Sequence, residues 1–151
     1  MVKMLKRILL AKLFILPTFV ILQTAHLDAV SIKNQGLAAV IFASAQALTE
    51  DGDYQEADQL LTQAMLADPS NDAAFALKGH VQTLMEKPKE GRRLLDLALN
   101  IRPDNLQAIM WAGQASLLLN DLDDAEQRLA RLEHLCGACD SYVSLDAEIA
   151  K

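Results

Sequence analysis

The chain has 151 residues, of which 52% are hydrophobic and 5% aromatic, and it carries a net charge of −6. This length is enough for one domain with a buried core. Residues 30–151 hold 10 basic and 19 acidic side chains, and such an acidic domain repels phosphate backbones, which argues against nucleic acid as a partner. Ala and Leu dominate the composition, which favours helices over sheets.

Residues 1–29 have the layout of a segment that directs export. A basic start precedes an apolar run over residues 13–22. The basic residues are Lys3, Lys6, Arg7 and Lys12. A run of ten residues suits the core of a signal peptide and is short for a membrane span.

The fate of this leader stays open. The small residues expected before a signal cleavage site are poorly matched, because Gln23 and Leu27 stand where small residues are needed. An uncleaved membrane anchor over Leu9–Leu27 therefore competes with a cleaved signal peptide. A third interpretation is an amphipathic N-terminal helix that packs on the rest of the chain. The first two predict an exported domain, periplasmic or anchored to the inner membrane.

Helices are predicted for nearly all of the remaining chain. Residues 30–37 are expected to be a short tether, and no later stretch alternates apolar and polar residues as a strand would. The expected helices fall in pairs, followed by one last helix. They lie within residues 36–50, 52–69, 73–85, 88–101, 106–120, 121–135 and 140–151.

Small residues and prolines recur along these helices at an interval of 34 residues. The recurring sets are Ala57, Gly91 and Ala125; Ala64 and Ala98; Gly79 and Gly113; Pro69 and Pro103. Two helices approach closely only where a side chain is small, and proline disfavours helix at the residue before it. We therefore expect paired helices that cross at the small residues, with Asn71 and Asn105 as N-caps. Gly79 and Gly113 should then contact a neighbouring helix in equivalent ways.

This pattern resembles the tetratricopeptide repeat (TPR) family, whose 34-residue unit is a helix–turn–helix pair. The units would be 38–71, 72–105 and 106–139, with residues 140–151 as a capping helix. The resemblance implies an all-α fold: a right-handed α-solenoid of three units, preceded by the apolar N-terminal helix. With its leader, the chain looks like a small exported or membrane-anchored bacterial-type TPR protein.

The resemblance also implies a concave groove, built from fixed positions of each first helix. These positions hold Phe42, Gln46, Thr49, Ala76, His80, Thr83, Gln107, Met110, Gln114 and Leu117. Chaperone-binding members of the family use basic and amide residues to hold a C-terminal carboxylate, and none of these positions is Lys, Arg or Asn, so that activity is not implied. We expect a helix or extended segment of another protein to bind there. The alternative is that the chain's own N-terminal helix, or a second copy, occupies the groove.

The end of the chain is expected to close the array. Gly137 suits the left-handed position after a helix C-terminus, and Asp140 is a candidate N-cap for the last helix. Tyr142, Leu145 and Ile149 lie on one side of that helix and would cover the open face of the third unit.

Cys136 and Cys139 are the only cysteines. If the domain is exported, an oxidising compartment favours a disulfide between them that pins the turn before the last helix. The tail is similar to cysteine pairs at the ends of small bacterial TPR proteins. The alternative is a thiol–disulfide redox factor, which needs a low-pKa thiol at a helix N-terminus.

No other pattern predicts chemistry. The acidic cluster over residues 121–126 suits a helix start and lacks the glycine and closing glutamate of a calcium loop. His26, His80 and His134 are scattered, and no metal site, cofactor motif or activated nucleophile is predicted. The sequence therefore predicts a non-enzymatic adaptor of the cell envelope that binds another protein and serves in assembling a larger complex. A short array is also compatible with a homo-oligomer.

Overall fold

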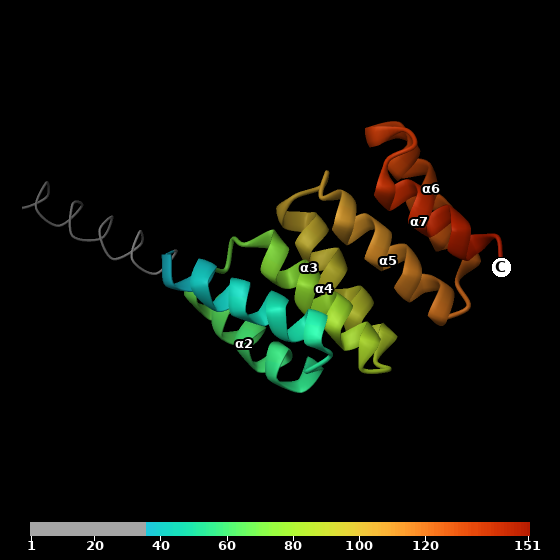
Figure 1. Ribbon diagram of the computed structural model, residues 1–151. Helices are drawn as coiled ribbons and strands as arrows, with labels where there is room; N and C mark the ends of the chain where they lie inside the picture. The colour runs from blue at the N-terminus through green and yellow to red at the C-terminus, as the bar shows by residue number, and fades with distance from the viewer. Residues whose placement is uncertain (1–35) are drawn as a thin grey trace, which may run out of the picture. The chain divides into compact units, whose positions relative to one another are not determined.

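The structure is a computed structural model that describes residues 36–151, so the predictions for the leader and for most of the tether lie outside the described residues. Every regular element of residues 36–151 is a helix, which confirms the all-α fold. The first helix spans residues 36–51. The others are α2 (Tyr54–Ala67), α3 (Asp72–Leu84), α4 (Pro88–Ile101), α5 (Leu106–Leu118), α6 (Leu122–Cys136) and α7 (Asp140–Ile149), as Figure 1 shows.

Consecutive helices pack against each other throughout this array. In addition, α3 contacts α5 and α5 contacts α7, whereas the backbones of α4 and α6 are not in contact. The first helices of successive pairs therefore lie closer together than the second helices, which gives the described residues a concave side lined by the first helices. Within residues 36–151, no helix is both long enough and apolar enough to cross a bilayer.

The helix boundaries follow from local residues. The predicted N-caps are confirmed: Asn71 accepts a hydrogen bond from the backbone N–H of Ala74 at 3.2 Å, and Asn105 accepts one from Ala108 at 3.0 Å. Pro88 is the first residue of α4, where a missing N–H costs no intrahelical hydrogen bond.

The start of α7 differs from the prediction. Asp140 is not the N-cap but the first helical residue, and Cys139 occupies the cap position without a side-chain hydrogen bond. The backbone of Cys139 is extended, and two residues earlier Gly137 turns the chain with a φ of +63° and a ψ of −133°. The positive φ of Gly137 agrees with the prediction, but its ψ lies outside the predicted left-handed helical region.

The recurring small residues lie where helices cross. Ala57, Ala64, Ala98 and Ala125 are fully buried. The crossing of α3 and α4 has no room for any side chain, because a Cβ added at Gly91 would lie 2.6 Å from the carbonyl oxygen of Gly79.

Gly113 does not repeat this arrangement, so the expectation of equivalent contacts is wrong. A Cβ added at Gly79 would meet Leu95 and Gly91 of α4, whereas at Gly113 the nearest atoms all belong to Leu145 of α7. The reason is that α7 takes the place of the first helix of a fourth unit, and Leu145 follows Trp111 by one 34-residue interval. Its branched side chain fills the space over Gly113.

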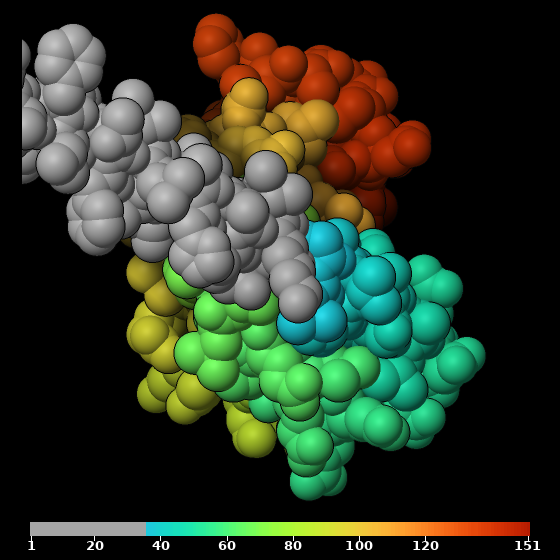
Figure 2. All heavy atoms as spheres, turned by 90° about the vertical axis from the view of Figure 1, so that its left-hand side faces the viewer, coloured from blue at the N-terminus to red at the C-terminus, as the bar shows by residue number. Residues whose placement is uncertain are grey.

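The buried side chains form two clusters. One joins the first helix to α2 and α3 around Ala45, Leu61 and Val81, and Figure 2 shows the atoms of these helices (blue to green) closely packed. The other joins α4 to α7 around Leu95, Ile109, Leu132 and Leu145. Trp111 packs against both clusters and connects them.

Leu145 is fully buried, and Tyr142 and Ile149 pack against the second cluster. The predicted closing role of the last helix is therefore confirmed. Without α7, the apolar side of α5 and α6 would face water.

Candidate functional site

A cavity of about 200 Å³ opens between the first helix, α3 and α5. Its lining comes from the facing sides of these three first helices and from the turn before α5. The lining residues are Phe42, Gln46, Thr49, Glu50, Ala73, Ala76, Leu77, His80, Asn105, Gln107 and Trp111. We call this space the groove cavity.

Six of the ten predicted groove residues line the groove cavity: Phe42, Gln46, Thr49, Ala76, His80 and Gln107. The other four do not. Thr83 donates its hydroxyl to the carbonyl oxygen of Gly79 at 3.0 Å, and Met110 and Leu117 pack against the second core cluster. Gln114 donates to the Glu148 carboxylate of α7 at 2.7 Å. The cap helix α7 therefore contacts the C-terminal part of α5, where the predicted groove residue Gln114 lies.

The predicted set omitted Trp111, which forms one wall of the cavity together with His80. Their rings are stacked, with centroids 4.3 Å apart and planes inclined by 8°. The helical spacing contained a signal for this residue, because Trp111 follows the predicted Gln107 by four residues and lies on the same side of α5.

Burial beside Trp111 lowers the pKa of His80 from 6.5 to about 4. The imidazole is therefore neutral at physiological pH, and it brings no positive charge to the cavity. A neutral imidazole still offers one donor and one acceptor nitrogen.

The amide side chains of the cavity differ in what they can still bind. Asn105 is occupied, since its Nδ2 donates to Asp72 at 2.6 Å and its Oδ1 accepts from Ala108. Gln46 and Gln107 are exposed and make no side-chain hydrogen bond within residues 36–151. These two amides are available to the backbone of a bound segment.

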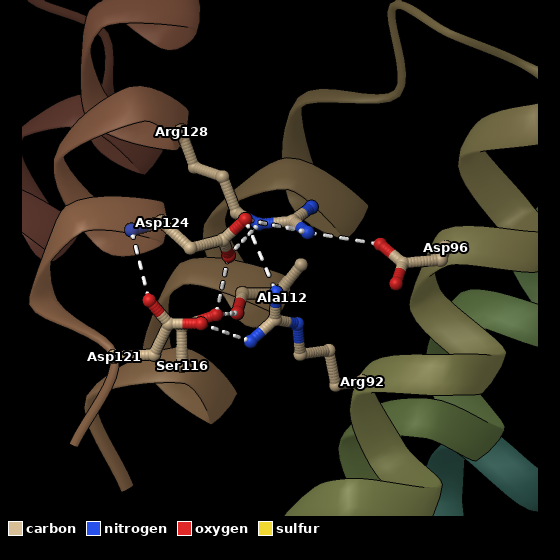
Figure 3. Close-up of polar contacts among 7 residues, drawn as sticks. All are labelled: Arg92, Asp96, Ala112, Ser116, Asp121, Asp124 and Arg128. Carbon is tan, nitrogen blue, oxygen red and sulfur yellow. Dashed lines mark hydrogen bonds and ion pairs between the residues drawn. The ribbon is translucent and has the colours of Figure 1, made fainter. Parts of the chain in front are cut away.

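A network of charged residues joins α4 to α6 and could be mistaken for a functional cluster (Figure 3). Arg92 donates to Asp121 at 2.7 Å and lies 3.3 Å from Asp124. Arg128 donates to Asp124 at 2.6 Å and to Asp96 at 2.9 Å.

The pKa shifts in this network favour the ionised carboxylates. The hydrogen bond from Arg92 lowers the pKa of Asp121. Burial raises the pKa of Asp124, but hydrogen bonds from Arg128 and Ser116 outweigh it, and the pKa falls overall. Asp121 also accepts from the backbone N–H of Asp124 at 3.3 Å, which confirms the predicted helix start. The cluster is thus a structural tie between the second and third helix pairs.

A disulfide joins Cys136, the last residue of α6, to Cys139, which precedes α7. The bond spans the turn at Gly137 and fixes the joint between α6 and the cap helix. No group of three or more His, Cys, Asp or Glu in the described part of the chain is arranged to hold a metal ion.

No protein-family model matches the sequence. Solved structures with a similar fold include the first TPR domain of Spaghetti (RPAP3) bound to the HSP90 peptide SRMEEVD, at 21% identity over 77% of this chain and 92% of that one, with a TM-score of 0.72. The Arabidopsis OM64 TPR domain has 14% identity over 78% and 97% of the two chains, with a TM-score of 0.72. The second TPR domain of human RPAP3, in complex with the HSP70 peptide SGPTIEEVD, has 19% identity over 78% and 98%, with a TM-score of 0.70. At these identities the likeness concerns the fold, and the fold of this chain is that of a tetratricopeptide repeat domain.

Proposed function

We propose that this chain is a non-enzymatic scaffold whose groove cavity binds a segment of another protein. The observation that carries the proposal is the composition of the cavity. It combines a buried apolar floor, the His80–Trp111 stack and two exposed amides, Gln46 and Gln107, without hydrogen-bond partners in the described residues. Apolar contacts and amides suit the side chains and the backbone of a docked peptide.

The solved structures with this fold lend support, because two of them hold chaperone peptides that end in EEVD. None of the cavity-lining residues in the described part of the chain is a Lys or Arg that could receive such an acidic end. We therefore infer a protein partner of different chemistry from those peptides.

We further propose that the domain works outside the cytoplasm, as part of a larger envelope assembly. The support is the basic and apolar leader over residues 1–29, together with the Cys136–Cys139 disulfide, since disulfides persist in oxidising compartments. Alkaline phosphatase fused at the C-terminus of the full chain should be active in a bacterial host. Inactive fusions that accumulate in the cytoplasm would contradict export.

Filling the cavity tests the binding proposal. Ala73→Trp places a large ring in the groove cavity, whereas Ala130→Trp makes the same change at an exposed site of α6 outside it. In affinity capture from solubilised cells, the wild type and the Ala130 variant should retain the same partner, and the Ala73 variant should lose it. Equal capture by all three, with both variants folded by circular dichroism, would rule out the groove.

The redox alternative makes an opposite prediction. If the chain acts through thiol–disulfide exchange, replacing Cys136 and Cys139 by serine abolishes its activity. For a scaffold, the same double variant keeps its partner and loses only some stability. The groove observations favour the scaffold, because neither cysteine lines the groove cavity.

A further inference from the structure

Among residues 36–151, Glu50 is the only charged side chain that lines the groove cavity. It is exposed at the rim, near the end of the first helix, and it forms no ion pair with any residue between 36 and 151. Five other carboxylates of the described chain do form ion pairs with Lys or Arg, as Asp58 does with Lys78. An unpaired carboxylate at the mouth of a cavity favours a cationic group from a bound molecule.

The floor of the cavity is apolar. Ala76 and Leu77 are 2% and 6% exposed, and Phe42 packs at one side. His80 is neutral at physiological pH, so none of the lining residues within 36–151 competes with a bound cation for Glu50. The cavity therefore has an apolar depth and an anionic rim.

The size of the cavity limits what it can hold. A volume of about 200 Å³ is enough to hold one long side chain. Lys and Arg match this shape, because their methylene stems cover apolar surface while the charged head stays at the rim.

Long-range charge acts in the same direction. Residues 36–151 carry nine Lys and Arg against nineteen Asp and Glu. Such a field raises the association rate of basic segments and lowers that of acidic ones.

We propose that the partner segment inserts one Lys or Arg side chain into the groove cavity, with its stem over Ala76 and Leu77 and its head at Glu50. This inference rests on the proposed function and names the partner's chemistry: a basic segment of another protein.

The test uses short random peptides displayed on phage and selected on the immobilised full-length chain. Four variants are compared with the wild type: Glu50→Gln, Glu50→Lys, Asp51→Asn and Asp51→Lys. Asp51 is exposed, adjacent to Glu50 and outside the cavity lining, so its variants match the change in net charge. Wild type and both Asp51 variants should enrich peptides with an excess of Lys and Arg. Glu50→Gln should remove the excess, and Glu50→Lys should reverse it in favour of Asp and Glu.

Replacing the basic residue of an enriched peptide by Gln should weaken its binding to the wild type roughly fivefold, the scale of a partly exposed ion pair. The same replacement should not change the affinity of the peptide for Glu50→Gln. Enrichment without an excess of basic residues, or an excess that Glu50→Gln leaves intact, would overturn the inference while leaving the groove as a binding site. Enrichment no greater than on Ala73→Trp would instead overturn the proposed function.

A synthetic peptide of residues 1–12, which contains all four basic residues of the leader, distinguishes the source of the segment. If it binds in a manner that depends on Glu50 and more tightly than the enriched peptides, the leader of this chain or of a second copy is the occupant, contrary to the proposal. Weaker binding than that of the enriched peptides is expected.

Discussion

Replacing Gly91 by alanine tests whether α3 and α4 pack as closely as the structure shows. The new Cβ would lie 2.6 Å from the carbonyl oxygen of Gly79 and would also clash with the hydroxyl of Thr83. The hydroxyl can rotate away, but the carbonyl belongs to the backbone of α3, so the two helices must separate. Overpacking of this kind typically costs about 1–3 kcal/mol, and a contact with backbone belongs at the upper end.

Alanine has a higher helix propensity than glycine, by about 1 kcal/mol, which offsets part of this cost. We therefore expect Gly91→Ala to lower the free energy of unfolding by about 2 kcal/mol, measured by urea denaturation followed by circular dichroism. Gly36→Ala is the matched control, because Gly36 is helical and has no atom within 4 Å of the added Cβ. It should be neutral or stabilising. If Gly91→Ala is as stable as Gly36→Ala, the close crossing of α3 and α4 is refuted.

Three further predictions concern the histidine, the charged network and the disulfide. Folding lowers the pKa of His80 from 6.5 to about 4, so the neutral imidazole contributes fully to the free energy of unfolding above pH 6.5, and this contribution is lost as the pH falls from 6.5 through 4. Between about pH 7.5 and 5, the free energy of unfolding of the wild type, measured by urea titration, should fall by about 2 kcal/mol more than that of His80→Gln. Equal losses in the two proteins would contradict this. Arg128→Gln should lower the free energy of unfolding by about 2 kcal/mol, because it leaves the partly buried Asp124 carboxylate with one cation fewer. The control Arg93→Gln, at an exposed position, should change it by less than about 0.5 kcal/mol. Equal effects of the two substitutions would contradict the network. Reduction of the disulfide should lower the free energy of unfolding by about 2 kcal/mol, the chain-entropy value for so short a loop. The reductant should not change the stability of the Cys136→Ser, Cys139→Ser double variant. A drop in that variant would show that the reductant acts elsewhere.

The helix boundaries could be predicted from the sequence because each depends on residues close to the boundary. Asn71 and Asn105 cap the helices that they precede, and Pro88 begins a helix at the one place where it costs nothing. The 34-residue interval then predicts which helices pair. The contact made by Gly113 could not be obtained in this way, because it depends on the tertiary placement of α7.

The groove could be predicted in position but not in extent. Fixed positions of the first helices indicate which residues face the concave side, but they do not say how far each side chain reaches. The indole of Trp111 reaches across to His80 from a position outside the predicted set. Gln114, which is in the set, is instead bound to Glu148. Proposed tests of the groove therefore belong at Ala73 and Glu50 rather than at Met110 and Gln114.

The charged network shows a similar limit. Asp124 and Arg128 are four residues apart on one helix, a spacing that predicts an ion pair from sequence. Arg92 and Asp121 are 29 residues apart, and no local rule pairs them. They come within reach because α5 packs against both α4 and α6.

The polar groups of the described chain thus fall into two classes that should respond differently to mutation. Arg92 and Arg128 each contact two carboxylates, so their charges are paired within the fold. Glu50, Gln46 and Gln107 have no side-chain partner in residues 36–151, so folding gains nothing specific from them. Substituting the arginines should therefore lower stability without changing the affinity for the partner. Substituting Glu50, Gln46 or Gln107 should lower the affinity for the partner without changing stability. A groove residue whose loss unfolded the domain would belong to the core, and an arginine whose loss altered only binding would belong to the site.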